Sequence, residues 1–209
     1  MVRLVGRARW LSHVNGVNPG REMRTWITDT ASLTIKLTSR SSEFRVRCLH
    51  QRIGLCLADE MNLLELRHRR CVREREVLLQ CDGRPVIFAH TVVPLSATAS
   101  DWPHFRGLGE RPLGTTLFGD ARVERGSMQY ARLPMRHPLV RRANEALGAD
   151  GPDAIRHPPC ARRCLYRRKN GVLLVTEVFL PAILETAVAT ADNAAKPRMR
   201  MNESNKQSI

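Results

Sequence analysis

The chain has 209 residues, of which 43% are apolar and 26% charged, and this balance fits one globular domain and excludes an intrinsically disordered chain. Its 34 Lys and Arg outnumber 20 Asp and Glu, and the formal charge of +14 at pH 7 indicates either anionic partners or simply a basic surface. No stretch reaches the ~18 consecutive apolar residues of a membrane span, so we expect a cytoplasmic protein without stable membrane insertion.

Neither nucleic acid nor metal is expected as a partner. The basic runs 67–70 and 162–168 contain a single aromatic residue, whereas proteins that bind single strands interleave aromatic side chains with basic ones. Six cysteines form no CxxC pair, which predicts reduced, mostly buried thiols. Cys160, Cys164 and His157 lack a second ligand pair at zinc-like spacing, so no metal site is predicted.

The predicted elements begin after a basic segment, residues 1–24, which we expect to be flexible. One globular domain is expected over 25–187, and the polar residues 188–209 should form a disordered tail. Within the domain the first element is a helix over 26–37. It is followed by a strand over 44–48, where apolar and charged residues alternate.

Two turns, Asp82-Gly83 and Asn170-Gly171, predict hairpins because both central residues of a type I′ turn adopt positive φ. The other predicted elements, in chain order, are a short helix over 61–66, strands over 72–81, 85–93 and 127–133, a helix over 138–147, and strands over 162–169 and 172–179. These elements predict an α+β fold with a single antiparallel sheet of about six strands, covered on one face by helices.

Glu177 is the most informative polar residue, because it lies within the apolar sequence 172–180. A carboxylate in such a strand should be buried and needs a partner. A structural salt bridge to one of the many arginines is an equally good explanation, so both interpretations stay open.

Arg75 shares a strand face with the apolar side chains that follow it, a position from which it can point inward, although the residues alone favour the exposed alternative given below. A guanidinium there offers a planar fork that binds a carboxylate through two hydrogen bonds. The alternative is an exposed ribbon on which Arg73 and Arg75 pair with Glu74 and Glu76.

The loop over 108–118 contains two glycines and a proline, which fix turns and expose backbone N–H groups able to bind an anion. Its glycines lack the spacing of either phosphate-binding motif. On its own this loop is more typical of a structural turn.

Taken in chain order, these pieces resemble the chorismate lyase family. They span the chain from Trp26 to Pro181, and their order and spacing together are more specific than any one piece. The matching pieces are Trp26 with Ser32-Leu33-Thr34, Arg75-Glu76-Val77-Leu78-Leu79, Asp82-Gly83 with Thr91-Val92-Val93-Pro94, Leu108-Gly109 with Pro112-Leu113-Gly114 and Leu117-Phe118, Arg162-Arg163, and Thr176-Glu177-Val178-Phe179-Leu180-Pro181.

The resemblance implies a monomeric enzyme that converts chorismate into 4-hydroxybenzoate and pyruvate for ubiquinone biosynthesis, without a metal or cofactor. It also implies flap-like loops that enclose a buried ligand site over the sheet. By the same resemblance Arg75 binds the ring carboxylate, and the backbone amides of Leu33 and Leu113 help to hold the ligand. Glu177 meets the hydroxyl end, so Arg75 and Glu177 are the expected catalytic pair.

Two other classes of function remain. A non-catalytic aromatic-acid sensor or carrier would resemble the effector-binding domains of GntR-type regulators, which share the general fold. The ~25 residues before Trp26 are fewer than the DNA-binding domain of such a regulator needs, which disfavours this class. The second class, a nucleic-acid-binding protein, is supported by the positive charge alone.

Overall fold

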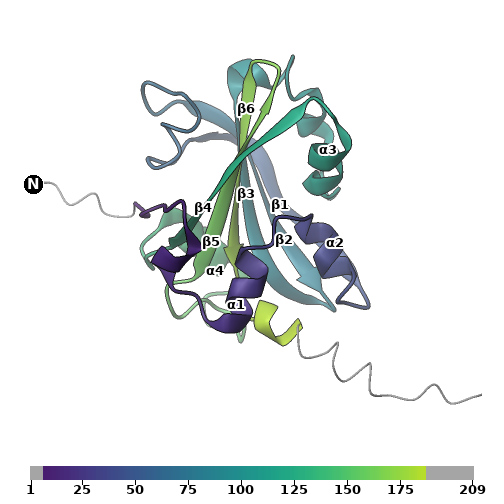
Figure 1. Ribbon diagram of the computed structural model, residues 1–209, viewed down its shortest axis with the longest axis vertical. Coiled ribbons are helices and arrows are strands. Elements are labelled where there is room, and N and C mark those ends of the chain that lie inside the picture. The colour runs from purple at the N-terminus through teal and green to yellow at the C-terminus, as the bar shows by residue number, and fades with distance from the viewer. Residues whose placement is uncertain (1–6, 187–209) are drawn as a thin grey trace, which may run out of the picture.

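The computed structural model describes residues 7–186, and one six-stranded sheet forms its core. The strand order is β1-β2-β3-β6-β5-β4, and every neighbouring pair is antiparallel (Figure 1). The α+β class with a single antiparallel sheet of six strands is therefore confirmed. The strands are β1 (Phe44–Leu55), β2 (Cys71–Cys81), β3 (Arg84–Pro94), β4 (Val123–Arg132), β5 (Cys160–Arg168) and β6 (Gly171–Phe179).

Helices cover both faces of the sheet, whereas the sequence predicts cover on one face. On one face Trp26 and Leu37 pack against Val77 and other apolar side chains of β1, β2 and β3. On the opposite face the apolar side of α4 packs against β2, β3 and β6. The helices are α1 (Arg21–Ile27), α2 (Leu33–Thr38), α3 (Leu113–Gly119) and α4 (Pro138–Leu147), with short 3₁₀ helices η1 (Val14–Val17), η2 (Leu95–Ala97) and η3 (Pro103–Gly107).

The helix predicted over 26–37 is wrong, because the chain forms two short helices separated by a turn at 28–32. Asp29 interrupts the helix, since its side chain accepts a hydrogen bond from the N–H of Ala31 at 2.8 Å. Ser32 then caps α2 by accepting from the N–H of Ile35 at 3.4 Å. Short polar side chains that compete for backbone donors thus favour the break.

Two further predictions of local structure are wrong. Residues 61–66 form turns rather than a helix, and Glu65 adopts a left-handed φ of 56°, which a helix does not accommodate. In the loop predicted over 108–118, α3 begins directly after Pro112, whose fixed φ suits the residue before a helix.

The first part of the chain is more ordered than the predicted flexible segment 1–24. Leu11 and Tyr130 exchange two backbone hydrogen bonds of 2.8 Å, and Val14 and Val17 are buried in the core. These apolar side chains offset the entropy of ordering the segment. Residues 1–6 and the predicted tail 188–209 lie outside the described residues.

The Asp82-Gly83 turn is confirmed, with φ of 50° and 79° at its two residues. The second hairpin differs by one residue: its turn is Lys169-Asn170, with a φ of 53° at Lys169, and Gly171 is the first residue of β6. Only glycine fits at position 171 without a steric clash, because a Cβ there would lie 2.5 Å from the Cβ of Asp101.

All six cysteines are free, and four of them are buried, which agrees with the expected thiols. Within residues 7–186 there is no helix both long and apolar enough to cross a membrane.

Candidate active site

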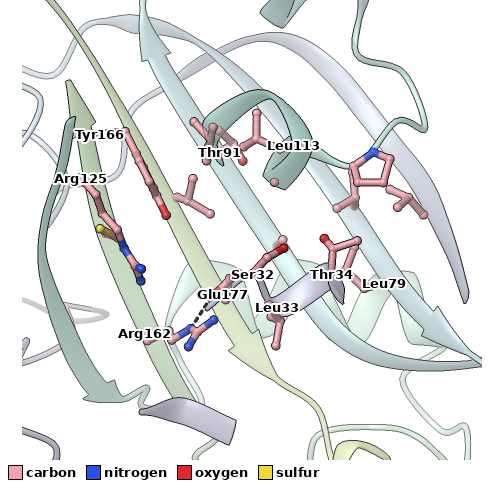
Figure 2. A pocket seen from close by; sticks show the side chains of 18 of the residues that line it. Ser32, Leu33, Thr34, Leu79, Thr91, Leu113, Arg125, Arg162, Tyr166 and Glu177 are labelled. Atoms are coloured by element: carbon pink, nitrogen blue, oxygen red, sulfur yellow. Dashed lines mark hydrogen bonds and ion pairs between the residues drawn. The ribbon is translucent and has the colours of Figure 1, made fainter. Parts of the chain in front are cut away.

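A cavity lies between the sheet and the helices α2 and α3 (Figure 2). Its empty space is about 710 Å³, a figure that includes the opening of the cavity to solvent. All four predicted site residues line it: Leu33 from α2, Arg75 from β2, Leu113 from α3 and Glu177 from β6. The fold thus brings together four side chains that are far apart in the sequence.

Arg75 is 2% exposed and fastens the loop before α3 to the sheet. Its Nε and Nη2 donate to the carbonyl oxygen of Gly109 at 3.2 and 2.8 Å, and Nη2 also donates to that of Arg111 at 2.9 Å. Burial lowers the pKa of Arg75, yet an arginine stays charged. Glu74 and Glu76 project from the opposite face of β2, so the exposed ribbon in which they pair with Arg75 is excluded.

The carboxylate of Glu177 is ion-paired with Arg162, which lies opposite it on β5. Arg162 Nε donates to Glu177 Oε2 at 2.5 Å. The side chain of Arg162 is 3% exposed and that of Glu177 18%, so Glu177 is less buried than the sequence predicts and faces the cavity. Glu177 therefore forms a structural ion pair and also lines the cavity, so the two interpretations of its sequence position are compatible.

Sequence reasoning missed Arg162 as a site residue because the predicted turn is displaced by one position. A turn at Asn170-Gly171 pairs Glu177 with Cys164, whereas the observed turn pairs it with Arg162. The register of this hairpin was the signal that could have identified the pair.

Arg162 also joins the sheet to the turn between α1 and α2. Its Nη1 donates to the carbonyl oxygens of Trp26 and Ile27, both at 3.4 Å, and to that of Asp29. The neighbouring carbonyl, that of Thr30, accepts from Nη1 of Arg125 on β4.

Polar side chains of three strands also line the cavity, namely Thr91 of β3, Arg125 of β4 and Tyr166 of β5, as do Ser32 and Thr34 of the α2 end (Figure 2). Burial raises the pKa of Tyr166, so its phenol stays neutral and can donate a hydrogen bond. The other lining side chains are mostly apolar, which suits the ring of a planar or nearly planar ligand.

A buried ionic cluster occupies the opposite face of the sheet. His90 Nδ1 lies 2.9 Å from Glu76 and its Nε2 lies 3.2 Å from Glu60, while Arg142 of α4 donates to Glu76 at 2.7 Å. Burial disfavours a charged His90, but Glu60 and Glu76 raise its pKa to about 10. Burial likewise disfavours a charged Glu76, but His90 and Arg142 lower its pKa to about 2. This cluster lies away from the cavity.

At the edge of the same cluster, His50, Glu74 and Glu76 place three potential metal-ligand atoms within 4.8 Å of one another. Arg52 already donates to Glu74 at 2.8 Å, and Arg142 donates to Glu76. Protein cations therefore neutralise these carboxylates, and we assign no metal to them.

The sequence is similar to one family of known proteins over most of its length. The family model described as chorismate lyase matches residues 4–189. A protein of Ralstonia nicotianae named "Probable chorismate pyruvate-lyase" is 48% identical over 164 residues, which cover 78% of this chain and 84% of the relative. One of the same name from Cupriavidus metallidurans is 43% identical over 194 residues, covering 92% and 89%.

Among solved structures, PhnF from Mycobacterium smegmatis aligns with a TM-score of 0.49 and 15% identity, covering 74% of this chain and 65% of that one. This likeness is too distant to bear on function.

Proposed function

Because the chain belongs to the chorismate lyase family, we propose that it removes pyruvate from chorismate and leaves 4-hydroxybenzoate. We further propose that it acts without a cofactor, as a cytoplasmic monomer that supplies ubiquinone biosynthesis. One observation carries the proposal: Arg75 and Glu177 line the same cavity, and the only carboxylate among the described lining residues, that of Glu177, is paired with Arg162. Arg75, whose Nε and Nη2 already donate to the carbonyls of Gly109 and Arg111, then finds its carboxylate partner in the ligand.

The geometry supports a division of roles within the cavity. The Arg75 guanidinium binds the ring carboxylate of chorismate from the β2 side. Leu33 and Leu113 are the first residues of α2 and α3, so their N–H groups have no partner within their helices and are available to the ligand. Glu177 contacts the C4 hydroxyl from β6.

The reaction needs little covalent work from the protein. The bond between C3 and the ether oxygen breaks, and the electron pair of the C4–H bond enters the ring, which becomes aromatic. The oxygen leaves as the enolate of pyruvate, which takes a proton on its methylene carbon. Glu177 orients the C4 hydroxyl or moves the proton lost from C4.

The test is to incubate the purified protein with chorismate and to follow pyruvate and 4-hydroxybenzoate together. We expect equal amounts of both, and we expect Glu177→Gln to lower kcat by about 10²-fold, as loss of an acid–base group does. Glu185→Gln is the matched control, because Glu185 is 64% exposed in a surface pair with Arg84.

Full turnover by Glu177→Gln would contradict the proton-transfer role. Binding of 4-hydroxybenzoate by the unaltered protein without any turnover of chorismate would instead favour the sensor or carrier.

A further inference from the structure

The charge of the cavity exceeds what a single carboxylate needs. Its described lining residues include three arginines, Arg75, Arg125 and Arg162, against one acid, Glu177, which is a formal charge of +2. Chorismate carries two carboxylates, whereas 4-hydroxybenzoate carries one. If the proposed function holds, the cavity matches the charge of the substrate rather than that of the aromatic product.

The position of Arg125 is fixed by a shared anchor. Arg125 and Arg162 donate to consecutive carbonyl oxygens, those of Thr30 and Asp29, so their guanidinium groups meet at the same turn. Arg162 in turn holds Glu177 at 2.5 Å. Figure 2 shows the side chain of Arg125 running from β4 toward Arg162 and Glu177.

The connectivity of chorismate says which carboxylate reaches this end of the cavity. The enolpyruvyl ether is on C3, next to the C4 hydroxyl and meta to the ring carboxylate. With the ring carboxylate on Arg75 and the C4 hydroxyl at Glu177, the second carboxylate lies beside Glu177 and away from Arg75.

We propose that Arg125 binds the enolpyruvyl carboxylate of chorismate and so distinguishes the substrate from 4-hydroxybenzoate. Arg125 lies at this end of the cavity beside the Arg162–Glu177 ion pair, which places a second guanidinium where the enolpyruvyl carboxylate is expected. A guanidinium suits the task, because it binds a carboxylate through two parallel hydrogen bonds. When the C3–O bond breaks, the contact passes to the leaving enolate, and the aromatic product keeps only its contact with Arg75.

Binding measurements with two ligands test this assignment. One is 4-hydroxybenzoate, and the other is 3-[(1-carboxyvinyl)oxy]benzoate, an inert ring that keeps both carboxylates of chorismate. Arg125→Gln should weaken binding of the dicarboxylate by about ten- to a hundredfold, the cost of losing a hydrogen-bonded charge, and should leave binding of 4-hydroxybenzoate unchanged. Arg125→Lys should restore part of the loss.

Two variants serve as comparisons. Arg75→Gln should weaken both ligands, since both carry the ring carboxylate. Arg47→Gln removes one positive charge from the exposed side of β1 and should change neither.

If Arg125→Gln weakened both ligands equally, its role would be to hold the turn at Thr30, and the assignment would be wrong. No effect on either ligand would also overturn it. Turnover of chorismate by the unaltered protein is measured in parallel. If the unaltered protein turns over chorismate but Arg125→Gln binds both ligands as the unaltered protein does, only this assignment is refuted. If the unaltered protein neither binds nor turns over chorismate, the proposed function is refuted and the assignment with it.

Discussion

Arg162 differs from the surface arginines of this basic chain because it has two kinds of partner at once. Its Nε binds the carboxylate of Glu177, and its Nη1 binds carbonyl oxygens of the α1–α2 turn. It is therefore a positioning residue, which fixes Glu177 and the turn that leads to Leu33. Lysine has the charge of this group without its planar fork.

Replacement of Arg162 by Gln should lower the free energy of unfolding by about 3 kcal/mol, because it leaves a largely buried carboxylate and several carbonyls without their donor. Urea denaturation measures this loss. Arg167→Gln on the same strand is the control: Arg167 pairs with Glu65 at the surface, where such a pair contributes roughly 0–1 kcal/mol. Equal losses in the two variants would contradict the idea that the buried contacts of Arg162 stabilise the fold more than a surface ion pair does.

At the level of elements, the strands were more predictable than the helices. Alternation and hairpin turns are local signals, and they placed the strands of both ribbons and the turn at Asp82. The α1–α2 break and α3 depend on single side chains, Asp29, Ser32 and Pro112, whose effect on the backbone cannot be weighed from periodicity.

Local sequence patterns also predict the candidate site only in part. The resemblance to the chorismate lyase family predicts Leu33, Arg75, Leu113 and Glu177 together, and all four line one cavity. The ion pair of Glu177 depends on a register that a shift of one residue in the turn changes, so local analysis could not assign it.

The β5–β6 hairpin leads to a prediction about Gly171. Gly171→Ala should lower the free energy of unfolding by about 1–3 kcal/mol, because its Cβ would meet Asp101 and Ala97 at 2.5 and 2.8 Å. Gly119→Ala is the control, since nothing lies within 4 Å of a Cβ there. Thermal and urea denaturation of both variants compare the two sites. If Gly171→Ala were as stable as the control, close approach would not be the reason for this glycine.

On the scale of the whole molecule, the cluster of Glu60, Glu76 and His90 links folding to pH. The pKa of His90 rises from 6.5 to about 10 on folding, so its contribution is complete below pH 6.5 and is lost as pH rises toward 10. The pKa of Glu76 falls from 4.5 to about 2, so its contribution is complete above pH 4.5 and is lost as pH falls toward 2. Both contributions are complete only between pH 4.5 and 6.5.

We therefore expect the urea midpoint to be higher at about pH 5.5 than at about pH 9, since the folded chain keeps a proton on His90 that the unfolded chain releases. His90→Gln should reduce this difference, and the variant is compared with the unaltered protein at both pH values. An unaltered protein whose midpoint stays constant from pH 6.5 to 9 would contradict the linkage.

The excess of arginine also affects the open side of the sheet. β1 is the last strand on that side, and no further strand of residues 7–186 pairs with it there. Arg45, Arg47 and Arg52 are exposed along it. Two copies meeting along this strand would bring like charges together, which opposes edge-to-edge pairing. Glu43 and Glu74 pair with Arg45 and Arg52 and neutralise part of this charge, so the excess of arginine along β1 disfavours edge-to-edge pairing of two copies without forbidding it.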